Sequence, residues 1–598
     1  MTGFELGGSI PPDTAHAVSV SLPTWSANVG YEEGQDWVVN KMTTGYPRFF
    51  IHRSIQDFAA EIVAKFGPNG YKAMLFPTQQ IACRCLSFIK SRCSPSSITT
   101  LTIVNLVLDA KNPAARSLEP LSPAISAVLL PEDVFPYAKQ YWQHSGDGVS
   151  SRRAEFCHGL LKDGLLRLDV GPNRPSSPPP QKPCRGPRRY RRTSSLDAGK
   201  PKAANGPPLE EVQESSRFLE ERFGRNLDIS FVAPAKSAIK RRIAGALRSN
   251  HELGASPLPN MESNTRGIVN LKEDDIYLFP CGMNAIFNAH RALLGSRGDM
   301  KSINFGFPYV DTLKILEKFG PGCLFYGHAS ESDLDELEKR LKDGERFLAL
   351  FCEFPGNPLL TCPNLVRIRE LADKYDFAVV VDETIGTFAN MNVLPYADIV
   401  VSSLTKIFSG DCNVMGGSAI FNPNNRYYQG LKEFAQREYQ DTYWPEDVMF
   451  MERNSRDFVS RIERINTNAE AICDVLRLHP AIKTIYYPKF NDSRANYETC
   501  KLAGGGYGGL ISISFHNQAQ AIAFYDAIDT AKGPSLGTNF TLTSPYVLLA
   551  HYQELDWAAG YGVDPNLVRI SVGLEETETI VRVFQLALDV TMKKTSAN

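Results

Sequence analysis

The amino-acid sequence predicts an α/β fold, with a large domain built on a mostly parallel sheet flanked by helices and a smaller α+β C-terminal domain. The first observation is an alternation of strand and helix patterns over residues 346–403, which is typical of βαβ units. The second is that the segments FAVVVD (377–382) and ADIVVSS (397–403) are almost entirely apolar, as in sheets covered on both faces. The third is that the pattern becomes looser beyond about residue 422.

The size and composition bound the class of protein. With 598 residues, the chain is several times the size of one domain, and we expect two well-packed domains plus additional segments. Hydrophobic residues make up 43% and charged residues 22%, and the formal net charge of -2 gives no field that recruits nucleic acid or a membrane. The sequence shows no secretory signal and no membrane span. The 12 scattered cysteines favour a reducing compartment, which predicts a cytoplasmic protein.

Four parts follow one another along the chain. Residues 1–170 form an N-terminal extension that is expected to be partly globular. Residues 171–208 are rich in Pro, Arg and Ser and poor in apolar residues, which predicts a disordered linker. Residues 209–421 are expected to form the large domain and residues 422–598 the small one.

The expected elements of the two domains follow in chain order. In the large domain we expect a helix with a basic face over 235–247, a strand over 275–279 and a helix over 284–294. A strand over 346–354, a helix over 364–376 and strands over 377–382 and 397–403 follow. The small domain begins with a long helix, followed by strands and helices over 456–479, 484–488, 508–515, 521–528, 567–574 and 578–590. The glycine run at 503–510 enters a strand and lacks the register of a phosphate loop, so we interpret it as a turn.

Two residues at the ends of neighbouring strands carry the chemical argument. Asp382 ends an apolar strand, where a buried carboxylate needs a partner such as a pyridinium nitrogen; a helix cap or a sheet edge is the alternative. Lys406 follows the next strand, at the edge where open α/β sheets bind ligands. The hydroxyls of Ser403 and Thr405 beside it suit phosphate oxygens. A desolvated lysine amine suits Schiff-base chemistry, whereas a lone lysine is usually a surface charge.

Other motifs supply further candidates. Gly282 and Met283 open a helix directly after a strand, which makes an anion site at the helix N-terminus. The ring of Tyr309 suits stacking on a planar cofactor, with simple packing as the alternative. Asn357 is either a donor to a ligand or part of a Gly-Asn-Pro turn. Arg569 lies inside an apolar strand and needs a carboxylate partner, either from a substrate or from the protein itself.

In order and approximate spacing, these motifs resemble those of the Cys/Met-metabolism (trans-sulfuration) family of fold-type I enzymes that depend on pyridoxal 5′-phosphate (PLP). Residues 403–406 correspond to the family's Ser-x-Thr-Lys motif, residues 380–384 to Val-Val-Asp-Asn-Thr and residues 281–285 to Ser-Gly-Met-x-Ala. Residues 356–358 correspond to Ser-Asn-Pro and residues 569–573 to Arg-x-Ser-x-Gly. The resemblance covers residue 209 to the C-terminus. The segments 16–34, 44–50 and 535–558 are similar to the fungal members, and so is the presence of a long N-terminal part.

The resemblance implies roles for the candidate residues. Lys406 would carry PLP as a Schiff base and act as acid and base, Asp382 would contact the pyridine nitrogen, and Tyr309 would stack on the ring. The implied phosphate-binding residues are Gly282, Met283, Ser403 and Thr405, and the implied residues around the substrate carboxylate and the cofactor hydroxyl are Asn357, Arg569 and Ser535. No metal is implied.

Two departures from the family's motifs affect these expectations. Family members complete the phosphate site with a Tyr-x-Arg from a neighbouring subunit, which implies a homodimer or homotetramer. Here Arg225, in Phe223-Gly224-Arg225, is favoured by its position, and Tyr46-Pro47-Arg48 is the second candidate. Residues 535–541 read SLGTNFT where many members have an acidic residue, which leaves the substrate preference open.

The resemblance implies a γ-replacement in which cysteine displaces the acyl group of an O-acylhomoserine and gives cystathionine. Sulfhydrylation of O-acetylhomoserine, cystathionine lyase chemistry and γ-substitution in secondary metabolism are the enzymatic alternatives. A catalytically inactive regulatory homologue is a further alternative, and the presence of Lys406, Asp382 and Arg569 argues against it.

Overall fold

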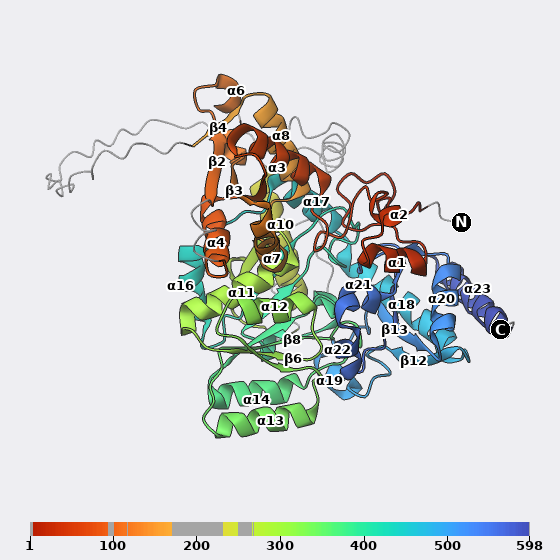
Figure 1. Cartoon of the computed structure of the whole chain (residues 1–598). Helices are drawn as coiled ribbons and strands as arrows, with labels where there is room; N and C mark the ends of the chain where they lie inside the picture. Colours follow the sequence, from red (N-terminus) through yellow and green to blue (C-terminus); the bar gives the residue numbers. More distant parts are fainter. Residues whose placement is uncertain are drawn as a thin grey trace, which may run out of the picture.

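The computed structural model describes residues 4–93, 101–116, 118–169, 231–248, 266 and 268–596. The predicted linker at 171–208 and Arg225 lie outside these residues. The described chain contains a four-stranded N-terminal sheet, a seven-stranded central sheet and a five-stranded C-terminal sheet (Figure 1). The central and C-terminal sheets confirm the predicted combination of a large α/β domain with a smaller α+β domain.

The central sheet has the strand order β5-β11-β10-β9-β8-β6-β7. Its strands are β5 (Ile276–Phe279), β6 (Ser302–Phe305), β7 (Cys323–Tyr326), β8 (Ala349–Glu353), β9 (Ala378–Asp382), β10 (Ile399–Ser402) and β11 (Gly417–Phe421). Only β11 runs against the others in this described sheet, since it is antiparallel to both β10 and β5. The carboxyl ends of β8, β9 and β10 therefore meet at one edge.

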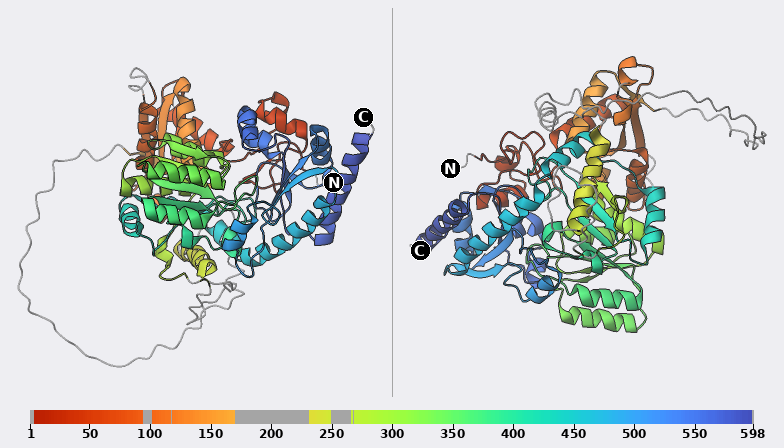
Figure 2. Two further views of the ribbon diagram at one scale, coloured as in Figure 1. Left: turned by 90° about the horizontal axis from the view of Figure 1, so that it is seen from below. Right: turned by 180° about the vertical axis from the view of Figure 1, so that it is seen from behind.

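Helices cover both faces of this sheet (Figures 1 and 2). One face packs against α11 (Gly282–Arg297), α12 (Val310–Lys318) and α16 (Tyr428–Glu438). The other packs against α10 (Val232–Arg248), α13 (Glu331–Lys342) and α14 (Leu365–Tyr375). In β9, Val380 faces the first set while Val379 and Val381 face the second. This burial on both faces is the reason that the strand has no polar alternation.

The C-terminal sheet has the order β12-β13-β16-β15-β14. Its strands are β12 (Ile482–Tyr486), β13 (Leu510–Phe515), β14 (Ala531–Lys532), β15 (Leu542–Ser544) and β16 (Val568–Ser571). The helices α18 (Phe458–Arg477), α20 (Gln518–Ala527) and α23 (Thr577–Ser596) pack on it. The glycine run enters β13 through a turn, as expected from the sequence.

The N-terminal sheet has the order β1-β3-β2-β4, with β1 (Tyr71–Phe76), β2 (Thr102–Leu108), β3 (Ile125–Pro131) and β4 (Leu166–Leu168). Its neighbouring strands are antiparallel, and α3 (Arg53–Phe66), α4 (Gln79–Lys90), α7 (Phe135–Ser145) and α8 (Ser151–Lys162) pack against it. We call residues 53–168 the N-terminal domain.

The residues before the N-terminal domain lie along the C-terminal part of the chain instead. They include α1 (Trp25–Glu32) and α2 (Asp36–Val39), and α1 lies beside α20 and α21 (Tyr546–His551) (Figure 1). The side-chain amide of Asn28 donates to the Tyr525 hydroxyl over 3.1 Å, and the amide of Val18 donates to the carbonyl of Cys412 over 2.9 Å. This path brings residues 44–50 to the carboxyl edge of the central sheet.

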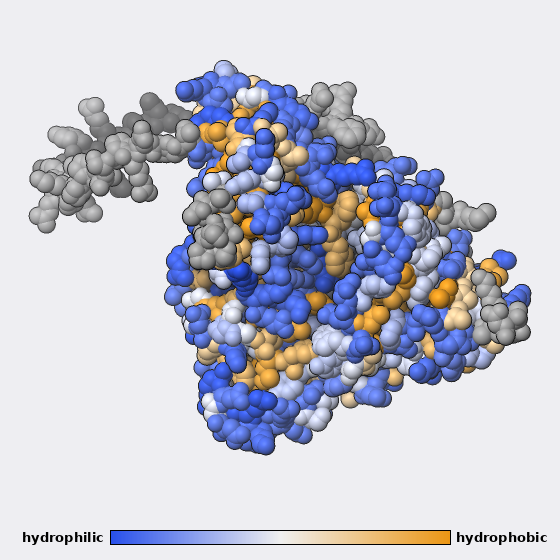
Figure 3. Space-filling model, viewed as in Figure 1, coloured by the Kyte–Doolittle hydropathy of each residue, from blue (hydrophilic) through white to orange (hydrophobic). Residues whose placement is uncertain are grey.

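In the part of the chain that the structure describes, no helix is long and apolar enough to cross a membrane. On the face seen in Figure 3, hydrophobic side chains form separate patches among hydrophilic ones.

Candidate functional site

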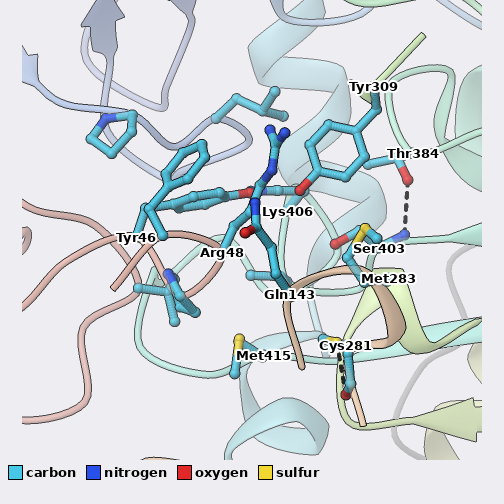
Figure 4. A pocket seen from close by; sticks show the side chains of 18 of the residues that line it. Tyr46, Arg48, Gln143, Cys281, Met283, Tyr309, Thr384, Ser403, Lys406 and Met415 are labelled. Carbon is cyan, nitrogen blue, oxygen red and sulfur yellow. Dashed lines mark hydrogen bonds between the residues drawn. The ribbon is translucent and has the colours of Figure 1, made fainter. Parts of the chain in front are cut away.

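A pocket lies at the carboxyl edge of the central sheet, between the sheet and the C-terminal domain (Figure 4). The ends of β8, β9 and β10, the first turn of α11 and strand β16 contribute to its walls. The N-terminal residues 45–52 and 142–151 contribute as well. The candidates that line it are Gly282, Met283, Tyr309, Asn357, Asp382, Ser403, Thr405, Lys406 and Arg569, together with Tyr46 and Arg48. Ser535 joins them through its contact with Lys406.

Lys406 is buried in the turn that follows β10, with 8% of the residue exposed. Its Nζ donates to the Tyr46 hydroxyl over 3.0 Å and lies 3.5 Å from Oγ of Ser535. No described carboxylate pairs with it. Burial alone raises the pKa of Tyr46, but the charges of Lys406, Arg48 and Arg569 lower it below its ordinary value. A lysine held by hydroxyls rather than by a carboxylate is available to react.

Asp382 ends β9 with one of its two carboxylate oxygens already engaged. Oδ1 accepts from the amide of Thr384 over 2.9 Å and from its hydroxyl over 2.6 Å. The Thr384 hydroxyl also accepts from the amide of Ser403 over 2.8 Å, which ties the ends of β9 and β10 together (Figure 4). Burial raises the pKa of Asp382. The second oxygen remains for a cationic partner, which restores the ionised form.

Glu353 is a half-buried carboxylate that the sequence motifs did not indicate. Parallel pairing of β8 with β9 places it opposite Asp382. It accepts from the amide of Asn357 over 3.0 Å and from the amide of Tyr309. Burial and the charge of Asp382 raise the pKa of Glu353 to about 8. The available signal was that the apolar segment 346–354 carries a carboxylate near its end, as 377–382 does.

Arg569 is 2% exposed and has no carboxylate partner among the described residues. Its guanidinium donates to Oδ1 of Asn357 over 3.2 Å and to the carbonyl of Ser535 over 2.9 Å, and it lies 4.3 Å from the centre of the Tyr546 ring. Desolvation lowers the pKa of Arg569 to about 10. A buried guanidinium that contacts only neutral groups is matched to a carboxylate brought by a ligand.

The first turn of α11 forms another part of the pocket wall. Gly282 lies so close to β10 that a Cβ there would be 2.7 Å from Cβ of Ser403. No acidic residue lies within this turn, and the positive end of the helix faces the pocket. The Thr405 hydroxyl, in contrast, already donates to the carbonyl of Gly416 over 3.2 Å and accepts from its amide over 3.0 Å.

Arg48 supplies a full positive charge to the same pocket. Its guanidinium carbon lies 4.7 Å from the centre of the Tyr309 ring, and its Nε pairs with Asp311. Figure 4 shows Arg48 between Tyr46 and Tyr309. The structure therefore brings the second Tyr-x-Arg candidate into the same pocket as Lys406 of the same chain.

These features fit PLP. The free oxygen of Asp382 suits a protonated ring nitrogen, and Lys406 is a buried amine that no acidic residue of the described chain contacts. The helix N-terminus at Gly282 and the Arg48 guanidinium suit a dianionic phosphate.

Comparisons with known proteins agree with this chemistry. Residues 259–589 match the model of the family "Cys/Met metabolism PLP-dependent enzyme", and residues 54–150 match "Fungal trans-sulfuration enzyme, N-terminal domain". The chain is 70% identical to a cystathionine γ-synthase of Neurospora crassa over 99% of both chains. It is 39% identical to a cystathionine γ-synthase of Saccharomyces cerevisiae over 98% of this chain and 99% of that one. A crystal structure of cystathionine γ-synthase from Xanthomonas oryzae is 21% identical, with a TM-score of 0.48, and the match covers 60% of this chain and 98% of that chain.

Proposed function

We propose that this chain, which belongs to the Cys/Met metabolism family of PLP-dependent enzymes, joins an O-acylhomoserine to cysteine and gives cystathionine. In this γ-replacement the Cγ–O bond breaks, a Cγ–S bond forms and the acyl group leaves as a carboxylate. The 70% identity to the Neurospora crassa enzyme over nearly the whole chain carries the choice of reaction. The product fits a role in the biosynthesis of methionine.

Bound PLP draws electrons away from Cα of an attached amino acid. The residues of this chain prepare that chemistry. We assign to Asp382 the partner role for the ring nitrogen and to Arg569 and Asn357 the orientation of the substrate carboxylate. Lys406 Nζ is then the base for the proton on Cα, and the hydroxyl of Tyr46, 3.0 Å away, can exchange a proton with it.

We also propose the residues that hold the phosphate and the ring, the oligomeric state and the location. We assign Gly282, Met283, Ser403 and Arg48 to the phosphate, and Tyr309 to the face of the ring, because these residues line one pocket and offer a helix N-terminus, a hydroxyl, a guanidinium and an aromatic ring. The family resemblance supports a homodimer or homotetramer. A cytoplasmic location is supported by the cysteines, since all 11 in the described residues are free thiols.

Product analysis tests the reaction. Purified protein is supplied with O-acetyl-, O-succinyl- or O-phosphohomoserine and either cysteine or sulfide. We expect cystathionine from cysteine with one of the three esters, and we expect Lys406→Ala to lower kcat by at least roughly 100-fold because the proton transfer is lost. The matched control is Lys432→Ala, which removes a lysine outside the pocket that contacts Asp275. Homocysteine from sulfide as the sole product would contradict the assignment of cysteine as the nucleophile.

A further inference from the structure

The N-terminal domain contacts the helix turn beside the pocket through the short segment 144–147, at the end of α7. Gly146 has φ +63°, and a Cβ at this position would lie 2.6 Å from Sγ of Cys281. The side chain of Asn284, in the first turn of α11, donates to the carbonyl of Ser145 over 3.0 Å and to Oδ1 of Asp147 over 2.7 Å. The segment therefore packs directly on the helix turn that faces the pocket.

His144 links this segment to a second helix. It is 6% exposed, with Nδ1 2.7 Å from Oδ1 of Asp311 and Nε2 3.0 Å from Nζ of Lys318. A lysine ammonium can only donate, so Nε2 of the imidazole accepts. Nδ1 then carries the hydrogen and donates to Asp311, which fixes the tautomer of the ring.

Asp311 connects His144 to a residue that lines the pocket. It is fully buried in the first turn of α12, and its other oxygen pairs with Nε of Arg48. The charge of Arg48 and the hydrogen bond from His144 together hold the pKa of Asp311 below its ordinary value, although burial opposes them. A continuous chain of contacts, His144–Asp311–Arg48, thus runs from the N-terminal domain to the guanidinium beside Tyr309.

We infer that His144 is a positioning residue for cofactor binding: it fixes Asp311, and through Asp311 the Arg48 guanidinium, in the orientation that receives the phosphate of PLP. The N-terminal domain thereby takes part in building the site. This inference rests on the proposed assignment of PLP to this pocket and not on which substrates the enzyme accepts.

Titration of the apoprotein with PLP tests the inference, with the visible absorbance of the bound cofactor as the readout. We expect His144→Ala to raise the dissociation constant roughly 10-fold, because a hydrogen bond to a buried charge is lost. His144→Asn should restore most of the affinity, since its amide can donate from the position of Nδ1. The matched control is His158→Ala, which removes another histidine of the N-terminal domain that pairs with a carboxylate, Glu61, over 2.5 Å. It should leave the affinity unchanged.

A double-mutant cycle separates positioning from general damage. If His144 acts through Arg48, then His144→Ala should have almost no effect on PLP affinity in the Arg48→Ala background. Wild-type affinity in His144→Ala, or a full effect in both backgrounds, overturns the inference. If His144→Ala does not fold, Asp311→Asn interrupts the same chain at its next member and undergoes the same cycle. The proposed reaction fails separately, through absence of cystathionine from a protein that still binds PLP.

Discussion

Arg569 offers the most direct test at the scale of single residues. Its guanidinium has three neutral acceptors and no described carboxylate, so a ligand carboxylate gains a charge-assisted bond without displacing an existing ion pair. Arg569→Lys keeps the charge but removes the planar fork. We expect the KM for the O-acylhomoserine to rise roughly 10- to 100-fold, while PLP binds with unchanged affinity. Steady-state kinetics measure the KM, and cofactor titration measures the affinity for PLP. An unchanged KM would contradict the assigned role.

Glu353 predicts a pH dependence of stability. Its pKa is raised in the folded protein to about 8, so the folded apoprotein binds more protons than the unfolded chain between that pH and the ordinary carboxyl range. The contribution of the protonated Glu353 to stability is present at low pH and is lost as the pH rises toward 8. The free energy of unfolding should therefore fall as the pH rises, and we expect Glu353→Gln to reduce this fall by roughly 1 kcal/mol per pH unit.

Denaturant unfolding of wild-type and variant apoprotein from pH 5 to pH 8 measures this difference, and other groups cancel in the comparison. The sequence shows a carboxylate at this strand end, but the shift depends on Asp382 in the adjacent strand. Parallel curves for the two proteins would mean that Glu353 titrates normally.

At the scale of elements, the close contact of α11 with the end of β10 determines the shape of the part of the pocket that we assign to the phosphate. Gly282→Ala places a methyl group 2.7 Å from Cβ of Ser403, so the helix must shift away from the strand. We expect the dissociation constant for PLP to rise at least roughly 10-fold, because the helix end and Ser403 no longer point at one phosphate.

Gly159→Ala in α8 is the matched control, because a Cβ there meets no atom within 4 Å. It should leave PLP affinity unchanged and raise the free energy of unfolding by about 0.5–1 kcal/mol, as expected for alanine in a helix interior. Cofactor titration and thermal unfolding of both variants provide the measurements. Equal PLP affinity in the two variants would show that the contact does not matter.

The sequence predicted the elements around the pocket well, for a local reason. Strands β8, β9 and β10 and helix α14 have strong apolar patterns, and their order alone places the ends of the strands at one edge. The antiparallel strand β11 was not predicted, because its direction depends on pairing with β5 and β10 rather than on its own residues.

At the scale of the whole molecule, the path of the N-terminal segment is the reason that we propose Arg48 for the phosphate site. Arg48 and Lys406 line one pocket within one chain. Mixed oligomers of inactive Lys406→Ala and Arg48→Ala chains should therefore show no recovery of activity, because each site lacks one of the two residues. Recovery after verified subunit exchange would place Arg48 across a subunit interface.

The same mixing experiment with Arg225→Ala tests the expectation drawn from the family resemblance, since Arg225 lies outside the described residues. Recovery in that mixture would identify Arg225 as a residue that a neighbouring subunit supplies. A fully active Arg225→Ala protein would instead leave Arg48 as the arginine of the phosphate site.

The sequence by itself determined the α/β class, the strand ends that carry Asp382 and Lys406, and the resemblance to a PLP-dependent family, because each depends on short patterns of neighbouring residues. Only the tertiary structure decided that Tyr46 lies beside Lys406 and Arg48 in the same pocket, that Arg569 lacks a described acidic partner, and that His144 contacts Asp311. These contacts join residues that are far apart in the chain, 360 positions for Tyr46 and Lys406 and 167 for His144 and Asp311. Such pairings depend on how whole domains pack, and no local pattern of polarity records them.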